Sequence, residues 1–423
     1  MSDYDAIIVG GGPAGSSTAY WLARGGARVL LVDRATFPRT KPCAEYLSPQ
    51  ASRLLSEMGV LDTVERAGAA HLAGMIIRAP NGAAIRGDFV ASHGYSAFRD
   101  RGLALRRIKL DPILLDCARN AGVEVREATR VADVVRTSDG RVTGVRLLRE
   151  HGASETISAP LVVGADGLRS VVARRLDLAR TSRIWPRRIA LVAHFENFGD
   201  VGEMGEMHVE RDVGYVGLAA VDGGLTNVAM VVPASAAREV SADRTAFFEN
   251  WLRARPQLAP RVAQARRVTP VLATGPFASH ARRAWAPGAA LVGDAADFFD
   301  PFTGEGIYSA LRGGELLAPH ALRALGATTA RDVDAALRAY DVERVREFRG
   351  KWIVEKLINA AVGFAPAMNY FSSTLAARKD MADLLVGVTG DFVPASAVLR
   401  PGYVMNLFRL PGAASAPRPL PDA

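Results

Sequence analysis

The hydrophobic pattern of the first 34 residues follows the order strand, helix, strand. The run DAIIVG at 5–10 is short, continuous and apolar, as expected of a strand buried on both faces. Apolar residues then recur at helical spacing over about 13–24, and a second apolar run, RVLLVD, occupies 28–33. Parallel strands need a crossover of this kind, so the pattern predicts a βαβ unit at the start of the chain.

Further along, the chain changes from alternating helices and strands to strands alone. One amphipathic helix is expected near 50–58 and another from about Leu110. Between about 184 and 275 the runs RIALVAHFEN, GEMHVERD, GYVGLAAV and LTNVAMVV follow in series, which is typical of an antiparallel sheet. Strands are also expected at MIIRA and AAIRGDF, VEVREA is expected to pair with GRVTGVRLL, and helices follow ALVGDAAD as far as about 387.

Composition excludes several classes of protein. With 423 residues and 49% hydrophobic residues, the chain can bury a large core. Its two cysteines cannot form a disulfide framework, and its first residues do not resemble a secretion signal, so we predict a cytoplasmic protein. The net charge of +8 comes mainly from arginines scattered along the sequence, so no nucleic-acid role is expected.

One uncharged stretch, 357–377, needs separate consideration. Gly363, Pro366, two asparagines and a Ser-Ser-Thr run make it a poor membrane-spanning helix, so no stable membrane insertion is expected. A buried helix pair and an apolar surface for an apolar substrate are both compatible with it. The final dozen residues, GAASAPRPLPDA, are rich in proline and alanine and are predicted to be disordered.

A glycine-rich turn lies between the first strand and its helix. Gly10, Gly12 and Gly15 have the G-x-G-x-x-G spacing, in which glycines allow a tight turn, close approach of a pyrophosphate and close packing of helix on strand. Asp33 ends the second strand, where a carboxylate binds ribose hydroxyls. The unit therefore predicts a dinucleotide site at a helix N-terminus.

Two later segments indicate which dinucleotide is bound. GADGLRS contains Asp166 and Gly167, and GDAADFFDPFTGEG contains Gly293 and Asp294, each pair at the end of a strand. A nicotinamide does not require such returns of the chain, whereas a flavin has a ribityl chain and a ring far from the first turn. FAD is therefore the predicted cofactor, and no metal site is expected.

Together these motifs resemble the FAD-dependent oxidoreductases of the para-hydroxybenzoate hydroxylase superfamily. KPCAEYLSP, PFTGEGIYSALRGGELLA and LLVGVTGDFVP are most similar to its geranylgeranyl-reductase-like branch. The resemblance implies an α/β fold, α+β overall, in which a Rossmann-like FAD-binding domain is interleaved with an antiparallel substrate domain. The implied parts are the FAD-binding domain at 1–70, 100–183 and 276–340, the substrate domain at 71–99 and 184–275, a helical C-terminal region at 341–410 and a tail at 411–423.

The resemblance also assigns residues to the cofactor, position by position. Amides of the TGEG segment would face the pyrimidine edge of the flavin and stabilise its reduced, negatively charged form. No role follows from the sequence for Glu305. The assigned residues are Gly10, Gly12, Pro13, Ala14, Gly15, Asp33, Arg34, Cys43, Ala44, Arg107, Asp166, Gly167, Gly293, Asp294, Pro301, Gly304, Glu305, Gly306 and Ile307.

Three departures from the related families bear on the reaction. Ala44 replaces a glycine that usually follows the cysteine, and this would narrow the approach to the flavin ring. Isoprenoid reductases usually carry Tyr-x-Trp-x-x-Pro, whereas here Tyr215 is followed by Gly217 and no proline. The halogenase tryptophan-proline signature and its lysine setting are missing as well.

These departures favour an FAD-dependent monooxygenase that hydroxylates an apolar or aromatic metabolite, of polyketide, phenol or quinone type, through a flavin hydroperoxide. A reductase of isoprenoid or other C=C bonds is the alternative, and a flavoprotein that matures a partner protein is a third. Only one dinucleotide fingerprint is present, so NAD(P)H would dock transiently, or a reductase or ferredoxin would deliver electrons.

Candidate catalytic and substrate residues follow from this hypothesis. Cys43, Glu45 and Tyr46 are candidates for proton transfer, although shaping the flavin pocket would also explain them. Tyr215, His194 and Trp185 are candidates for contact with a small apolar substrate, and His93 and Arg99 are further candidates.

Overall fold

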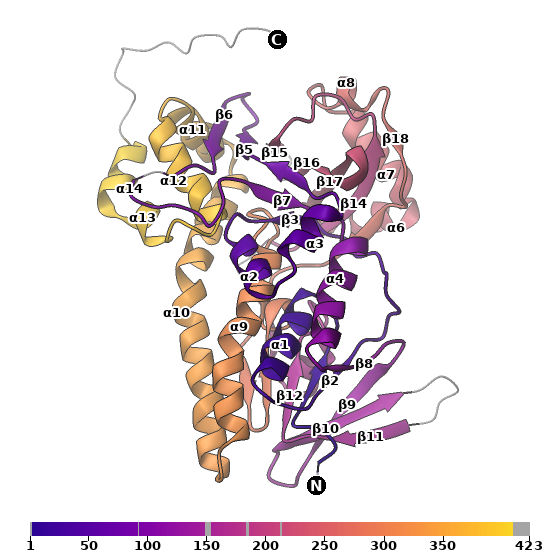
Figure 1. Ribbon diagram of the computed structural model, residues 1–423. Coiled ribbons are helices and arrows are strands. Elements are labelled where there is room, and N and C mark those ends of the chain that lie inside the picture. Colours follow the sequence, from indigo (N-terminus) through magenta and orange to yellow (C-terminus); the bar gives the residue numbers. More distant parts are fainter. Residues whose placement is uncertain (1, 92, 149–153, 183–185, 212–213, 409–423) are drawn as a thin grey trace.

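The computed structural model describes residues 2–91, 93–148, 154–182, 186–211 and 214–408. Trp185 and the predicted tail at 411–423 lie outside the described residues. One part of the molecule contains a parallel sheet with its helices, another contains a larger sheet, and a long helix runs along one side of the first part (Figure 1). This is the predicted mixed α/β architecture with a helical C-terminal region. The domain boundaries stay a prediction.

The N-terminal βαβ unit forms as the hydrophobic pattern predicts. Strand β1 (Ala6–Val9) lies parallel to β2 (Val29–Val32), with α1 (Pro13–Arg24) as the crossover. All eight strand residues are buried, which explains their continuous apolar runs. The sheet has the order β21–β22–β12–β1–β2–β8, with β21 (Trp285–Ala286), β22 (Ala289–Leu291), β12 (Leu161–Gly164) and β8 (Glu124–Arg126).

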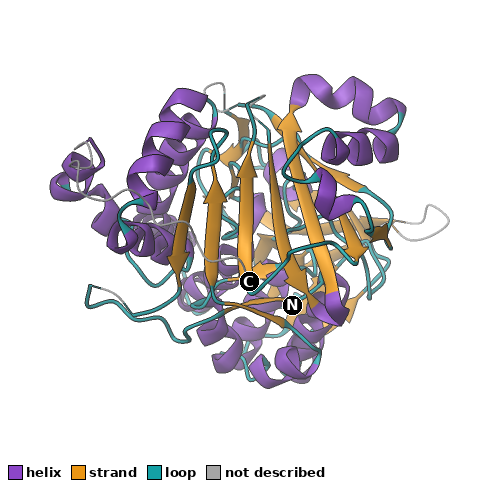
Figure 2. Cartoon of the chain, turned by 90° about the horizontal axis from the view of Figure 1, so that it is seen from above, coloured by secondary structure: helices purple, strands orange, loops and turns teal. Residues whose placement is uncertain are grey.

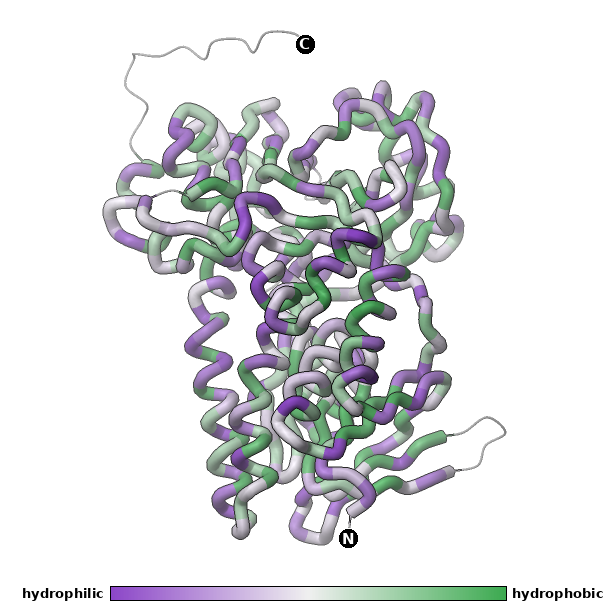
Figure 3. Tube along the Cα trace, viewed as in Figure 1, coloured by the Kyte–Doolittle hydropathy of each residue, from purple (hydrophilic) through white to green (hydrophobic). Residues whose placement is uncertain are grey.

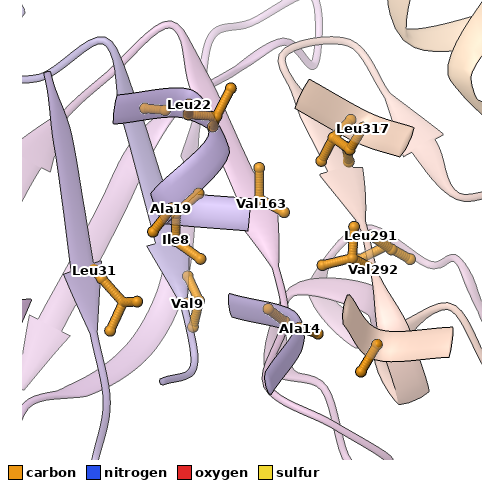
Figure 4. Close-up of a cluster of buried hydrophobic side chains, with 14 of the residues drawn as sticks. Ile8, Val9, Ala14, Ala19, Leu22, Leu31, Val163, Leu291, Val292 and Leu317 are labelled. Carbon is orange, nitrogen blue, oxygen red and sulfur yellow. The ribbon is translucent and has the colours of Figure 1, made fainter. Parts of the chain in front are cut away.

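Helix α9 (Gly306–Leu325) completes the core of this part. It packs against both α1 and α10 (Ala330–Val362). Figure 4 shows side chains from α1, the central strands and α9 turned toward one another in a buried cluster. A segment 294 positions downstream of α1 is thus held against it, with Ser17 Oγ donating a hydrogen bond to the Leu311 carbonyl at 2.9 Å.

The second large sheet has eight strands, which Figure 2 shows from above with helices around them. It is antiparallel except for one parallel pair, β15 with β5, because residues 74–88 join it from a distant part of the chain. Its order is β18–β14–β17–β16–β15–β5–β6, with β19 also on β14: β18 (Arg266–Arg267), β14 (Arg188–Glu196), β17 (Leu225–Pro233), β16 (Tyr215–Val221), β15 (Met204–Val209), β5 (Gly74–Arg78), β6 (Ala84–Asp88) and β19 (Leu272–Thr274).

Two expectations about strands and helices are wrong. The predicted pair does not form: β8 joins the parallel sheet beside β2, and β10 (Val142–Leu148) pairs instead with β9 (Arg130–Arg136). Strand β9 is closer to β10 in the sequence than β8 is, so β9 and β10 form a hairpin. Strand β8 is then free to extend the parallel sheet. The region 184–275 is also not strands alone, because α6 (Ala237–Ala242), α7 (Arg244–Arg253) and α8 (Ala259–Val262) follow β17.

The remaining elements complete the frame. Helix α4 (Arg107–Asn120) begins before Leu110, with an ion pair between Arg107 and Asp111 in its first turns. The other elements are α2 (Ala51–Glu57), α3 (Leu61–Arg66), α5 (Val171–Arg175), β3 (Tyr46–Leu47), β4 (Ala70–Leu72), β7 (Gly102–Ala104), β11 (Ser154–Ser158), β13 (Ala179–Thr181), β20 (Ser279–Ala281) and β23 (Asp297–Phe298).

The C-terminal region is helical beyond the predicted end at 387. It comprises α11 (Ala365–Ala376), α12 (Lys379–Thr389), α13 (Ser396–Leu399) and α14 (Pro401–Phe408). Figure 3 shows hydrophobic and hydrophilic residues alternating along α9 and α10. Among the described residues, every helix is too short or too polar to cross a bilayer.

Candidate functional site

The glycine turn leaves an opening at the N-terminus of α1. A side chain at Gly15 would place its Cβ 1.7 Å from the Gly10 carbonyl oxygen, and Gly10 itself has φ of 107°. At Gly12, by contrast, the nearest atoms are guanidinium nitrogens of Arg107 and Arg39, both 3.6 Å away. Packing therefore requires the outer two glycines, and the middle one faces two cations.

Cations gather around this opening. Arg107 is buried and forms an ion pair with Asp111 at 2.6 Å, and Arg39 approaches the same carboxylate at 3.2 Å. Lys41 lies 3.9 Å from Asp294. Of these cations only Arg107 was predicted, because Arg39 and Lys41 lie in an irregular loop whose path the sequence pattern does not reveal.

The acidic residues of the three motifs take different positions around the opening. Asp33 is fixed at the end of β2, where its carboxylate accepts hydrogen bonds from the Gly11 and Ala35 amides at 2.7 and 2.8 Å. Arg34, next to it, is exposed. Asp166 accepts from the Val171 amide at 2.6 Å, while its buried Oδ1 has no partner among the described residues. Burial raises the pKa of Asp166.

The later motifs lie close to the first turn. A side chain at Gly167 would approach the Lys41 ammonium at 3.7 Å, and one at Gly293 would meet the Ala14 methyl at 2.8 Å. Both glycines have positive φ, at 75° and 59°. Segments separated by more than 120 positions in sequence thus form one wall, because β12 and β22 are neighbours in the parallel sheet.

A single cavity of about 250 Å³ connects these elements. It runs from Gly12 to the start of α9, where Gly306 has no atom within 4 Å of the position of a Cβ. The residues fit FAD, because Gly12 is open toward the cavity and cations for a diphosphate lie beside it, whereas Asp166 itself does not line the cavity. The predicted cofactor residues that line the cavity are Gly12, Pro13, Ala14, Cys43, Ala44, Arg107, Gly167, Gly293, Asp294, Pro301, Gly304, Glu305, Gly306 and Ile307.

The segment that leads from β23 into the first residue of α9, residues 297–306, is called the GEG loop below. Gly304 has φ of 73°, and a Cβ there would lie 2.9 Å from the Tyr46 ring. Helix α9 begins at Gly306, and no side chain caps its first amides. The glycines therefore keep the helix start open toward the cavity, an arrangement suited to negative charge.

The loop at residues 41–46, called the cysteine loop below, is held by Glu45. This buried residue has φ of 63°, and its carboxylate lies 2.7 Å from His194 Nε2. It also accepts hydrogen bonds from Asn227 Nδ2 at 2.9 Å and from the Arg107 amide at 3.0 Å. With three partners, Glu45 holds the loop against β14 and β17. Its predicted role in proton transfer stays a prediction.

The other members of the cysteine loop differ from Glu45. Cys43 Sγ accepts a hydrogen bond from the Glu45 amide at 3.3 Å. Tyr46 is buried, and its hydroxyl lies 3.5 Å from the Thr389 carbonyl in the C-terminal helices. Burial, with a contribution from Glu305, raises the pKa of Tyr46 well above its usual value.

The eight-stranded sheet forms the roof of the cavity. Strand register places Val192, Ala229, Gly217 and Met207 in one row across four adjacent strands. All four residues line the cavity. The two with the smallest side chains, Gly217 and Ala229, are neighbours in the middle of this row. Gly217, where the isoprenoid reductases of the resemblance have tryptophan, has no side chain, and the Met207 sulfur lies 3.1 Å from where its Cβ would be.

Of the predicted substrate residues that the structure describes, only Tyr215 lines the cavity. Its hydroxyl donates to Asp300 at 2.5 Å, and Asp300 forms an ion pair with Arg188 at 2.9 Å. His194 contacts Glu45 instead. His93 is exposed, and Arg99 forms an ion pair with Glu65, so neither lines the cavity.

Sequence reasoning missed the wall formed by α10. Lys351 and Glu355 line the cavity from this helix, together with Phe348 and Trp352. A signal was present, because Glu347, Lys351 and Glu355 are spaced four apart and fall on one helix face. Within the described residues, no group of three or more metal-ligating side chains is arranged to hold a metal ion.

Comparison with known proteins gives a consistent result. The family described as FAD binding domain matches residues 3–347. A digeranylgeranylglycerophospholipid reductase of Methanothrix thermoacetophila is 30% identical over 359 residues, 84% of this chain and 85% of that protein. Conditioned medium factor receptor 1 of Dictyostelium discoideum is 27% identical over 74% of this chain but only 62% of its own length. The myxobacterial chondrochloren halogenase CndH has a TM-score of 0.72 at 27% identity, covering 83% of this chain and 82% of the halogenase.

Proposed function

This chain belongs to the FAD binding domain family and is an FAD-dependent oxidoreductase, and from that premise we propose that it hydroxylates an apolar, ring-bearing substrate. The substrate would lie between the flavin site and the roof strands. Polyketide, phenol and quinone rings match this description. One observation carries the proposal: the hydrogen bond between Tyr215 and Asp300, both of which line the cavity beneath the roof strands.

The roof residues would select a flat apolar ring. Gly217 and Ala229 are cross-strand partners on β16 and β17, and they have the smallest side chains of the row that faces the cavity. The neighbouring Val192 and Met207 supply apolar contact on either side. Burying such a ring would remove apolar surface from water at about 25 cal/mol per Å².

Tyr215 and Asp300 would handle the proton of a phenolic hydroxyl. Burial, followed by the charge of Asp300, raises the pKa of Tyr215 well above its usual value, so its hydroxyl stays neutral. It can then accept a hydrogen bond from the substrate while donating to Asp300. Asp300, which forms an ion pair with Arg188 at 2.9 Å, would be the final acceptor of the proton. Drawing the proton away makes the ring more electron-rich and therefore more reactive toward oxygen.

Bound FAD would supply the two electrons for the reaction. In the overall balance, a substrate C–H bond, O₂, two electrons and two protons give C–OH and water. NAD(P)H, docking transiently, is the proposed source of the electrons, and a separate reductase or ferredoxin is the alternative. The apolar lining lies inside the cavity, which supports a small substrate over a partner protein.

A second candidate is reduction of an isoprenoid or other C=C bond. The relative from Methanothrix, named as a reductase, favours it. Bound FAD would supply the hydride, Tyr215 would donate its proton to the far carbon, and a proton taken up from solvent through Asp300 would restore the Tyr215 hydroxyl. The glycine at 217, where the isoprenoid reductases of the resemblance have tryptophan, argues for the first candidate.

The two candidates differ in their products. Purified holoenzyme would be incubated with NAD(P)H, ¹⁸O₂ and a panel of alkyl phenols, quinones and prenyl alkenes, followed by mass spectrometry. Hydroxylation adds one ¹⁸O atom to the product, whereas reduction adds two hydrogens and no label. A saturated product formed without oxygen contradicts our proposal and establishes the second candidate.

The role of Tyr215 is tested separately. Tyr215→Phe is expected to lower the turnover of a phenol by about 10²-fold, the low end for loss of an acid–base group. Bound flavin should remain at the wild-type level. Tyr370→Phe in α11 is the matched control, because Tyr370 packs against Phe408 and does not line the cavity. Equal turnover in both variants would remove Tyr215 from the mechanism.

A further inference from the structure

A group of buried charges joins the GEG loop to α10 and to the C-terminal helices. We call Glu305, Lys351, Glu355 and Asp391 the Lys351 cluster. The Lys351 ammonium lies 3.8 Å from Glu305 Oε2, forms an ion pair with Asp391 and lies 4.2 Å from the centre of the Tyr308 ring. Lys351 is therefore the link between Glu305, beside the start of α9, and the segment after α12.

Glu355 lies one helical turn beyond Lys351. Its Oε1 accepts a hydrogen bond from the Asp300 amide at 3.0 Å. Three members of the cluster, Glu305, Lys351 and Glu355, line the cavity. The cluster thus contacts the site from α10 and from the GEG loop.

The cluster has more carboxyl groups than cations. Glu305 and Asp391 share the ammonium of Lys351, Glu355 has no cation of its own in the cluster, and the side chains of Glu305, Lys351 and Asp391 are 12%, 16% and 0% exposed. Three ionised carboxylates would leave two uncompensated charges away from water, at a cost of several kcal/mol each. Holding a proton on one carboxyl avoids part of that cost.

The surroundings do not supply the missing positive charge. Arg188 is engaged by Asp300, and Arg312 by Glu315 and Glu347. The titratable and charged groups that face the cluster from other elements are Tyr46 of β3, Arg188 of β14, Tyr215 of β16, Asp297 of β23, Asp300 of the GEG loop, Tyr308 and Arg312 of α9, and Glu347 of α10.

The pKa shifts of the two glutamates agree with the excess of carboxyl groups over cations in the cluster. Burial, followed by the charges of Glu305 and Asp300, raises the pKa of Glu355 well above its usual value. Burial also raises the pKa of Glu305, while Lys351 opposes the shift. These carboxyls therefore retain protons at a pH where exposed glutamates are ionised.

We propose that the Lys351 cluster is a redox-linked proton store, which takes up a proton when the flavin is reduced and releases it on re-oxidation. Glu305 lies between the two glycines whose amides face the predicted pyrimidine edge. Reduction adds negative charge there, and negative charge raises the proton affinity of nearby carboxylates. The balance is two electrons and one proton on the flavin, with one further proton from solvent converting a cluster carboxylate to the acid.

This role goes beyond the proposed reaction and depends only on FAD binding. It would keep the net charge of the cavity nearly constant through the catalytic cycle. It also gives Glu305 a function that the sequence does not reveal. Lys351 acts as a positioning residue, since its ammonium holds the Glu305 carboxyl at the end of the GEG loop, beside the start of α9.

The test counts protons taken up per two electrons. Holoenzyme without substrate or oxygen is reduced stoichiometrically with NADH or dithionite in weak buffer that contains a pH indicator, at intervals from about pH 5 to pH 9. Wild type is expected to take up more than one proton per flavin in part of this range, after correction for protons released by the reductant. Glu355→Gln and Glu305→Gln should return the uptake to one. Because substrate and oxygen are absent, a wrong assignment of the reaction leaves this result unaffected.

Two further measurements keep the outcome decisive. Glu343→Gln is the control, since Glu343 lies on the same helix but contacts His320 outside the cavity, and it should keep the excess uptake. Infrared difference spectra of wild type should show a carboxylic acid band that grows on reduction, which does not depend on the variants folding. Uptake of one proton at every pH, or excess uptake retained in Glu355→Gln, would overturn the proposal.

Discussion

Glu45 is buried and Glu305 is largely buried, and each lies in one of the two loops that line the cavity, but their surroundings differ. Three donors saturate Glu45, namely His194, Asn227 and the Arg107 amide. Glu305 has one cation 3.8 Å away, and Lys351 shares that charge with Asp391. The cysteine loop is thus held by a satisfied network, whereas the GEG loop adjoins a network with too few cations. A satisfied buried network gives rigidity, and an unbalanced one can respond to a change of charge.

The largest expected effect comes from breaking the network of Glu45. Glu45→Ala leaves the Arg107 amide without its acceptor and removes one partner each from His194 and Asn227, so we expect a loss of about 3–5 kcal/mol of unfolding free energy. Urea denaturation of the apoprotein measures it. Glu305→Gln, which leaves Lys351 paired with Asp391, should cost about 1 kcal/mol or less. Equal losses in both variants would contradict the distinction between the two loops.

The next prediction concerns the place where the two loops meet. Asp294, beside the GEG loop, lies 3.9 Å from Lys41 of the cysteine loop, and its side chain is 26% exposed. Asp294→Ala should weaken FAD binding by about tenfold or more, as for a lost hydrogen bond to a charged group of about 1.5–3 kcal/mol. The fold should be unaffected. Flavin fluorescence during titration of the apoprotein measures the change, with Asp62→Ala on exposed α3 as the control. A variant purified with full flavin occupancy would disprove the assignment of Asp294.

The smallest expected effect is on the pH dependence of folding stability. It distinguishes a carboxyl whose charge is matched by cations from one that has too few cations nearby. Burial acts to raise the pKa of Asp222, but hydrogen bonds from Arg106 and Lys109 outweigh it and lower the pKa to about 2. Its stabilising effect is complete above its ordinary value of 3.8 and is lost as pH falls toward 2, with a size of about 1–2 kcal/mol after solvent screening. Glu355 has the opposite sign: its pKa is raised above 4.5, so stability is lost as pH rises through the folded value.

Denaturation across the pH range tests both signs at once. Asp222→Asn should flatten the acid side of the stability profile and leave the other side unchanged. Glu355→Gln should flatten the side at higher pH. If one variant altered both sides, the two carboxyls would belong to one coupled network, and the comparison between the loops would fail.

The elements that could be predicted are those that depend on residues close together in the sequence. Continuous apolar runs with glycine punctuation identified β1, α1 and β2, and a serial run of strands identified most of the roof. The strand pair at 123–148 was mispredicted because the choice of partner depends on which edge of the parallel sheet is free. Helices α6, α7 and α8 were overlooked between stronger strand signals.

The candidate site divides in the same way. Gly10, Gly12, Gly15 and the later Asp-Gly and Gly-Asp pairs were recognisable because a backbone conformation demands particular residues at short spacing. Arg39, Lys41, Lys351 and Glu355 carry no such local signature. A charged residue looks the same in sequence whether it faces solvent or a cavity, and only the packing of its helix or loop decides which.

The sequence by itself determined the βαβ unit and the glycine turn, because each depends on residues close together in the chain, and it indicated FAD because three such local motifs occur in one order. The tertiary structure alone decided that Glu45 meets His194 across 149 positions and that α10 brings Lys351 to Glu305. Such pairings follow from how helices and sheets pack to bury their apolar faces. Burial then sets the electrostatic character of the charges enclosed, and in this protein it distinguishes a fixed loop from one adjoining a store of protons.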